Sequence, residues 1–129
     1  MTYLLDSNVL IALSAPEHAD HAPMRGWAAG VRSFAVCPIV QGALVRHFLR
    51  FGRSLAQAQA VLRALAQRPG YEFWPDDLSY AEAALGDVRG HKQVTDAYLA
   101  ALARAHGCRL ATLDAALAAL HPDVADLIP

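Results

Sequence analysis

The stretch that decides the fold is TYLLDSNVLIAL, residues 2–13. Its apolar start, Thr2 to Leu5, ends at Asp6, and this pattern predicts a buried strand followed at once by a helix over Asn8 to Leu13. Asp6 or Ser7 would cap that helix, because short polar side chains accept hydrogen bonds from the free N–H groups of a first turn. A strand that leads directly into a helix is typical of α/β proteins.

The same alternation of strand and helix continues to the end of the chain. Short apolar runs closed by Pro, Gly or Asp predict further strands over Ser33–Cys37, Tyr71–Trp74, Cys108–Thr112 and Val124–Ile128. Periodic apolar residues and capping signals predict helices over His18–Gly30, Ile39–Phe51, Leu55–Gln67, Ser79–Leu85 (with Glu82 at the capping-box position), Thr95–His106 and Asp114–Leu120. We therefore expect one α/β domain over residues 1–129, an α/β/α sandwich whose central, mainly parallel sheet has four or five strands.

Composition excludes several classes of protein. Hydrophobic residues make up 55% of the 129 residues and charged residues 18%, which excludes a disordered chain. The net charge of −1 excludes a global basic field, so that any site for a polyanion must be a local patch. No apolar run approaches the ~20 residues that cross a bilayer, and we expect a soluble, cytoplasmic protein without a membrane partner. The high apolar fraction indicates a face shared with a partner or a second copy.

Three aspartates fall where an open parallel sheet gathers its functional groups, outside the carboxyl ends of the strands. Asp6 follows the first strand, Asp114 follows the fourth, and Asp96 lies in the first turn of the long helix. Each alone is explained as a helix cap. Together they would bring three negative charges close to one another, which is unfavourable without a cation. Oxygen ligands favour Mg²⁺ or Mn²⁺, ions that polarise a phosphodiester and activate water.

The segments that hold these acids resemble the motifs of PIN-domain ribonucleases: Asp6 in LLDSNVLI, Asp96 in VTDAYLAALA and Asp114 in LATLD. The segments CPIVQGALVR, FWPDDLSYAEA and LHPDVADLIP resemble the toxin branch of that family, VapC of the VapBC toxin–antitoxin systems. The resemblance covers essentially the whole chain. It implies a PIN-like fold and a Mg²⁺-dependent endoribonuclease that acts as a toxin, with Mn²⁺ as a possible substitute. It also implies RNA as substrate, with a VapB-like antitoxin and a second toxin subunit as partners.

In this resemblance Asp6, Asp96 and Asp114 are the metal ligands, and a metal-activated water is the nucleophile. PIN domains usually carry a fourth acid, a glutamate, on the helix after the second strand, and Gln41 stands at the matching position. A neutral amide supplies no charge, although it could orient a water or a phosphate, so Gln41 joins the candidate catalytic residues. The alternative reading is therefore a catalytically weakened protein of the same fold that binds RNA or a partner.

Further polar residues surround this constellation in the sequence. Ser7, Asn8 and Thr112 are either ordinary cap and strand residues or groups that hold Asp6 and a bound water in place. Four cations are candidates for binding RNA phosphates or, equally, for a solvated surface: Arg46, Arg50, Arg53 and Lys92. Phosphoryl transfer through a covalent aspartyl-phosphate at Asp6 is a third reading. It is disfavoured because that chemistry needs a second aspartate where Asn8 stands.

Overall fold

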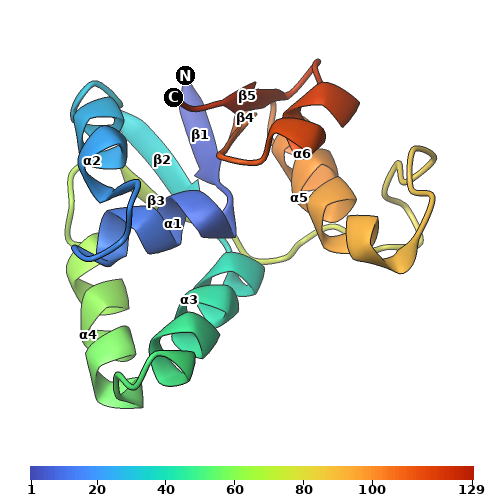
Figure 1. Ribbon diagram of the computed structural model, residues 1–129. Helices are drawn as coiled ribbons and strands as arrows, with labels where there is room; N and C mark the ends of the chain where they lie inside the picture. Colours follow the sequence, from blue (N-terminus) through green and yellow to red (C-terminus); the bar gives the residue numbers. More distant parts are fainter.

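Five parallel strands form a single sheet in the computed structural model, which describes all 129 residues (Figure 1). The strands are β1 (Thr2–Leu5), β2 (Ser33–Val36), β3 (Tyr71–Phe73), β4 (Arg109–Thr112) and β5 (Ala125–Leu127). Their order across the sheet is β3-β2-β1-β4-β5, and every neighbouring pair is parallel. The predicted α/β class, the parallel sheet and the position of each strand are confirmed.

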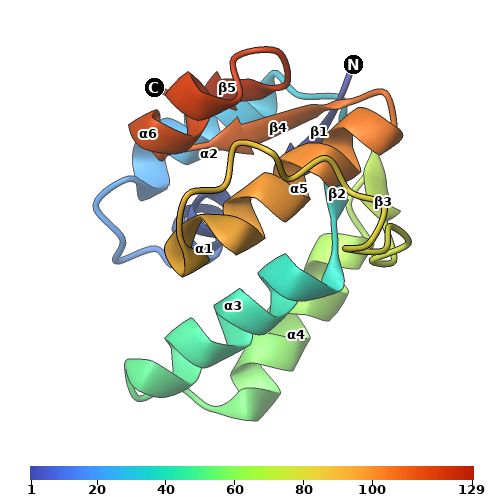
Figure 2. The same cartoon turned by 90° about the vertical axis from the view of Figure 1, so that its right-hand side faces the viewer.

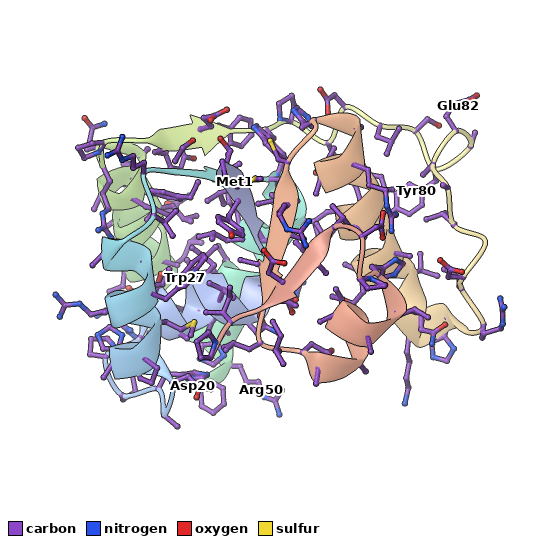
Figure 3. All side chains as sticks on the ribbon, turned by 90° about the horizontal axis from the view of Figure 1, so that it is seen from above. Met1, Asp20, Trp27, Arg50, Tyr80 and Glu82 are labelled. Atoms are coloured by element: carbon purple, nitrogen blue, oxygen red, sulfur yellow. The ribbon has the colours of Figure 1, made fainter.

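The helices cover both faces of this sheet. They are α1 (Ser7–Ser14), α2 (His21–Ala29), α3 (Pro38–Arg50), α4 (Leu55–Ala66), α5 (Val94–Ala105) and α6 (Ala115–Leu120), with a short 3₁₀ turn, η1 (His91–Gln93), before α5. Seen along the sheet, α1, α2 and α4 lie on one side and α5 and α6 on the other (Figure 3). None of these helices combines the length and the apolar composition needed to cross a bilayer.

The strand order creates a switch point beside β1. From β1 the chain moves to β2 and then β3 in one direction, and it then returns to place β4 on the opposite side of β1. Right-handed crossovers in opposite directions put their helices on opposite faces. The carboxyl ends of β1 and β4 therefore meet where the helices diverge, which is the usual position of a ligand site in an open α/β sheet.

Helix α5 is the most deeply buried element of the core. Seven consecutive residues, Ala97 to Ala103, are buried, and four of them are alanines. Small side chains let the helix lie close to its neighbours, while Tyr98, Leu99 and Leu102 fill the space around it. A helix packed on every side has little freedom to shift, so Asp96 in its first turn is carried by a rigid element.

The structure corrects two predicted helices. The segment Ser79–Leu85 is a turn in a largely exposed loop that joins β3 to η1, visible as the long connection beside α5 in Figure 2. The Ser79 hydroxyl accepts the N–H of Ala81, and only two backbone bonds, from Glu82 and Ala83, return to the Ser79 carbonyl. The capping signal is present, but no apolar stripe packs the turn against the core, and an unpacked short helix is unstable. Helix α2 also begins later than predicted, at His21.

Gly70 offers a test of how closely β3 approaches β2. Its φ is +84°, and an added Cβ would lie 1.8 Å from the Arg32 carbonyl oxygen. Gly107 also has a positive φ, +66°, but has open space around it. We expect Gly107→Ala to cost about 1–2 kcal/mol, the ordinary penalty of the left-handed region. Gly70→Ala should cost at least ~3 kcal/mol because the backbone must move as well. Urea denaturation of both variants measures the difference, and equal losses would contradict the close approach.

Candidate metal centre

The three aspartates lie at the switch point between β1 and β4. Asp6 follows β1 directly and caps α1, while Asp114 follows β4 after one residue and caps α6. Leu5 pairs with Ala111 in the sheet, and the backbone N–H of Asp6 donates to the Ala111 carbonyl at 2.9 Å. Asp96 comes from the first turn of α5, on the other side of the sheet from α1 (Figure 3). Segments far apart in the sequence therefore place these acids around one switch point.

The pKa values of two of the acids are raised, first by burial and then by the charges of the neighbouring carboxylates. Burial, reinforced by the negative charges of Asp6 and Asp114, raises the pKa of the Asp96 carboxyl to about 6. Burial also raises the pKa of Asp6, which is only 3% exposed, and the charge of Asp114 raises it further. Hydrogen bonds from Thr112 and Ser7 act in the opposite direction on Asp6. The site therefore concentrates negative charge in a partly buried region.

The three acids differ in how many hydrogen bonds their carboxylate oxygens accept from the protein. Asp6 accepts from the Ser7 N–H at 2.8 Å and from the Thr112 hydroxyl at 2.7 Å, one bond to each oxygen. Asp114 Oδ1 accepts the N–H groups of two residues in α6, at 2.9 and 3.1 Å. Asp114 Oδ2 and both oxygens of Asp96 receive no hydrogen bond from the protein.

These free oxygens are the donor set that a hard divalent cation requires. In the side-chain positions of this structure, no three acidic, histidine or cysteine side chains are gathered closely enough to hold an ion. The fit to a cation rests instead on the unsatisfied carboxylate of Asp96, half-buried among like charges, a state that a cation would relieve.

The side chains of two of the three predicted supporting residues, Thr112 and Asn8, hold the chain segments around Asp6 and Asp114 together. The Thr112 hydroxyl donates to Asp6 and accepts the backbone N–H of Asp114 at 3.0 Å, so that one group links both acids. Asn8 accepts the N–H of Leu113 at 3.1 Å, and its amide nitrogen lies 3.5 Å from the Thr112 oxygen. Ser7 contributes its backbone N–H. Together they fix the loop that follows β4 against the start of α1.

Gln41 lies in the second turn of α3, which begins at Pro38 directly after β2. Its side chain is half-buried and makes no hydrogen bond within the protein. The amide therefore has both its donor and its acceptor free.

The candidate RNA-binding cations do not form one track. Arg46 and Arg50 line a depression of about 400 Å³ between α1 and α3, together with His47, Ile11 and Ala43. Arg53 instead stacks over the Phe48 ring, 4.0 Å from its centroid, and lies 3.8 Å from Glu17. Lys92 is exposed in η1, before Asp96. Figure 3 shows Arg50 projecting from the edge of the molecule.

His121 is a residue of this region that sequence reasoning missed. It lines a small cavity together with the site acids; the lining residues are Gln93, Asp96, Asp114, Ala116, Leu117, Leu120 and His121. The signal that could have found it is spacing, because His121 follows Asp114 by seven residues, two turns along one helix face.

The chain is similar to proteins of one family over nearly its whole length. Residues 3–121 match the PIN domain. The chain is 54% identical to Ribonuclease VapC29 of Mycobacterium tuberculosis over 130 residues, covering 100% of this chain and 98% of the relative. It is 42% identical to Ribonuclease VapC39 of the same species, covering 92% of each.

Two solved structures share the fold at low identity. A toxin–antitoxin complex from Klebsiella pneumoniae aligns with a TM-score of 0.71 at 20% identity, covering 97% of both chains. VapC20 of M. tuberculosis, described as a toxin that cleaves the sarcin–ricin loop, aligns with a TM-score of 0.64 at 17% identity, covering 92% of this chain and 94% of that one. The acids at the switch point, the parallel sheet and the full-length similarity lead to one conclusion: the chain belongs to the PIN-domain family and, within it, to the VapC ribonucleases.

Proposed function

We propose that this protein is the toxin of a toxin–antitoxin pair and cleaves RNA with Mg²⁺, or Mn²⁺ in its place, held by Asp6, Asp96 and Asp114. The observation that carries the proposal is the half-buried carboxylate of Asp96, which lies beside two other acids and has no hydrogen-bond donor. When bound, such a cation would neutralise a phosphodiester and activate a water molecule to attack phosphorus.

In this proposal, the remaining residues hold the acids in place or contact the substrate, and they do not bind the cation. Thr112, through its bonds to Asp6 and to the Asp114 backbone, keeps the two strand ends in register. Asn8 secures the loop between them through the Leu113 N–H. The free amide of Gln41 can donate to a phosphate oxygen, but it adds no charge, so three carboxylates must balance whatever cation binds. The similarity to ribonucleases does not favour the alternative of a catalytically weakened protein that binds RNA or a partner.

The proposed partners follow from the family and from the surface. Toxin–antitoxin complexes are among the similar solved structures, which supports a cognate VapB-like antitoxin for this chain. A second copy of the chain is also proposed, because large apolar side chains remain exposed, among them Leu49, Phe51, Leu55 and Leu127. RNA would approach along Arg46 and Arg50, beside α1, whose first turn follows Asp6.

Replacement of Asp96 by Asn tests the proposed chemistry. The substitution keeps the size of the side chain but removes its charge, and we expect cleavage of RNA with Mg²⁺ to fall by at least ~100-fold, since even residues outside the metal's first shell are worth about 10–100-fold. The matched control is Asp20→Asn, an exposed aspartate in the loop before α2, which should cleave as wild type does. Equal cleavage by wild type and Asp96→Asn would refute the assignment.

The burial of Asp96, together with the charges of the two neighbouring acids, predicts an unusual dependence of stability on pH. Its pKa is about 6 in the folded protein against an ordinary value of 3.8, so the folded state is favoured while the carboxyl is protonated and loses stability as the pH rises through about 6. In EDTA at neutral pH, Asp96→Asn should therefore be more stable than wild type. The gap should shrink below about pH 4 and also on adding Mg²⁺. Urea denaturation at both pH values, with and without Mg²⁺, measures the difference in free energy of unfolding between the two proteins. A difference that does not depend on pH or Mg²⁺ would contradict the burial of Asp96 beside the other two acids.

The depression lined by arginines predicts which cations bind RNA. Arg46→Ala and Arg50→Ala should each weaken RNA binding and reduce the slope of log affinity against log salt by about 0.7. Arg63→Ala, an exposed arginine on α4, should leave both unchanged. Arg53→Ala should lower stability by ~0.5–2 kcal/mol, because its guanidinium lies over Phe48, with little effect on RNA affinity. Fluorescence anisotropy at several salt concentrations measures the slopes, and uniform slopes would count against the assignment.

A further inference from the structure

Two neighbouring depressions on the surface meet at His47, which lines both of them. The first, of about 400 Å³, lies between α1 and α3 and is lined by Ile11, Ala43, Arg46, His47 and Arg50. The second, of about 380 Å³, is lined by Ala15, Glu17, His18, His47 and Phe51. Ala15 lies one turn beyond Ile11 along α1, which begins directly after Asp6. Phe51 follows the last turn of α3, at the end that points away from the sheet (Figure 1). Together the depressions form one groove, the α1–α3 groove, whose far end lies away from the acids.

Phe51, at the far end of the groove, is the most exposed aromatic side chain of the protein, with 63% of its surface open to solvent. The centroid of the His47 ring lies 4.7 Å from that of Phe51, with 45° between the two planes. The Arg50 guanidinium lies 5.6 Å from the centroid of the Phe51 ring. Tyr80, another exposed aromatic residue, is instead stacked on Tyr98. Phe51 therefore offers a flat apolar surface bordered by basic side chains.

The groove carries more positive than negative charge. Arg46 and Arg50 form no ion pair with any acid of the chain. Glu17 is the acid that lines the groove, and it lies 3.8 Å from Arg53, whose guanidinium covers the Phe48 ring. Arg53 thus offsets the charge of Glu17. What remains is a pair of unpaired cations next to an exposed ring.

An unpaired nucleotide has the two chemical features that match this groove, a phosphate for the arginines and a flat base for the ring. Proteins that bind single-stranded nucleic acids place basic side chains along the backbone and aromatic side chains against the bases. A second copy of the chain fits the groove less well. A two-fold interface centred on the groove would bring Arg46 and Arg50 of both copies face to face, and like charges at an interface are unfavourable.

We propose that the α1–α3 groove is a subsite for an unpaired nucleotide of the RNA substrate, with Arg46 and Arg50 at its phosphates and Phe51 stacked against its base. The far end of the groove lies away from the acids, so the stacked nucleotide is outside the bond that is cut. Every base has a face that can stack, and the subsite therefore selects unpaired RNA over duplex without reading its sequence. This inference rests on the proposed function, which makes RNA the ligand.

Binding of two RNA probes tests the subsite, measured by fluorescence anisotropy in EDTA so that no cation supports cleavage. One probe is an unstructured single-stranded oligoribonucleotide, and the other is the same strand annealed to its complement. We expect Phe51→Ala to bind the single strand about 10-fold more weakly than wild type, the scale of losing one stacked base. The duplex should bind equally well to both proteins, because its bases are stacked on one another. Phe51→Trp should bind the single strand at least as tightly as wild type, since the larger ring still stacks.

Leu55→Ala is the matched control for the loss of an exposed apolar side chain. Leu55 is close to Phe51 in the sequence and is 49% exposed, but it does not line the groove. This variant should bind the single strand as wild type does. Phe51→Ala should also keep the wild-type slope of log affinity against log salt, because the contacts of Arg46 and Arg50 with phosphates remain. The unchanged slope separates stacking from the loss of charge contacts.

Equal binding of the single strand by Phe51→Ala and wild type would overturn the proposal, and so would equal losses on the single strand and the duplex. Analytical ultracentrifugation gives a further test: conversion of a dimer to a monomer by Phe51→Ala would assign the groove to contact between two copies and overturn the RNA subsite. Failure of the proposed function looks different, because the proteins would show the expected binding pattern and yet leave RNA intact with Mg²⁺. If the subsite alone is wrong, wild type cleaves RNA and Phe51→Ala binds it equally well.

Discussion

The rest of the site depends on the two hydrogen bonds of the Thr112 hydroxyl. It donates to Asp6 and accepts from the backbone of Asp114, so a single oxygen joins the ends of two neighbouring strands. A helix begins at each of these strand ends, and the N-terminus of a helix favours negative charge. The protein can therefore keep two carboxylates near one another without an arginine or lysine between them. The buried helix α5 then adds Asp96 from the opposite face of the sheet.

The site acids and two of the candidate RNA-binding arginines lie on different elements. Asp6 and Asp114 follow the central strands and Asp96 begins α5, whereas Arg46 and Arg50 lie along α3, in a depression shared with α1. Two other arginines already form ion pairs with acids outside the site, Arg104 with Asp123 and Arg109 with Asp126. In the proposed function, a cation balances the charge of the three acids, and Arg46 and Arg50 remain available for a polyanion. Such a division would let a chain of net charge −1 bind a negatively charged substrate through a local patch.

The local sequence pattern was enough to predict the strands. Apolar runs such as Ser33–Val36 are followed by proline or glycine, and their apolar residues do not show the three- and four-residue spacing of a helix. It failed at Ser79–Leu85, where the residues typical of a helix start are present but most of the segment is exposed, with Tyr80 stacked on Tyr98. The placement of Asp6 and Asp114 after neighbouring strands was predictable from the rule that the carboxyl ends of parallel strands lie at one edge of the sheet. The burial of His121 and its contact with Arg104 were not predictable, because Arg104 lies 17 residues away in the sequence and burial depends on the whole fold. The contacts of Arg53 with Phe48 and Glu17 were not predictable for the same reason.

The separation of β1 from β4 along the chain has a consequence for folding. The hydroxyl that orients Asp6 belongs to Thr112, 106 positions further along the chain. This hydrogen bond can form only after β4 has paired with β1, so a partly folded chain in which only β1, β2 and β3 have assembled cannot hold Asp6 in its native orientation.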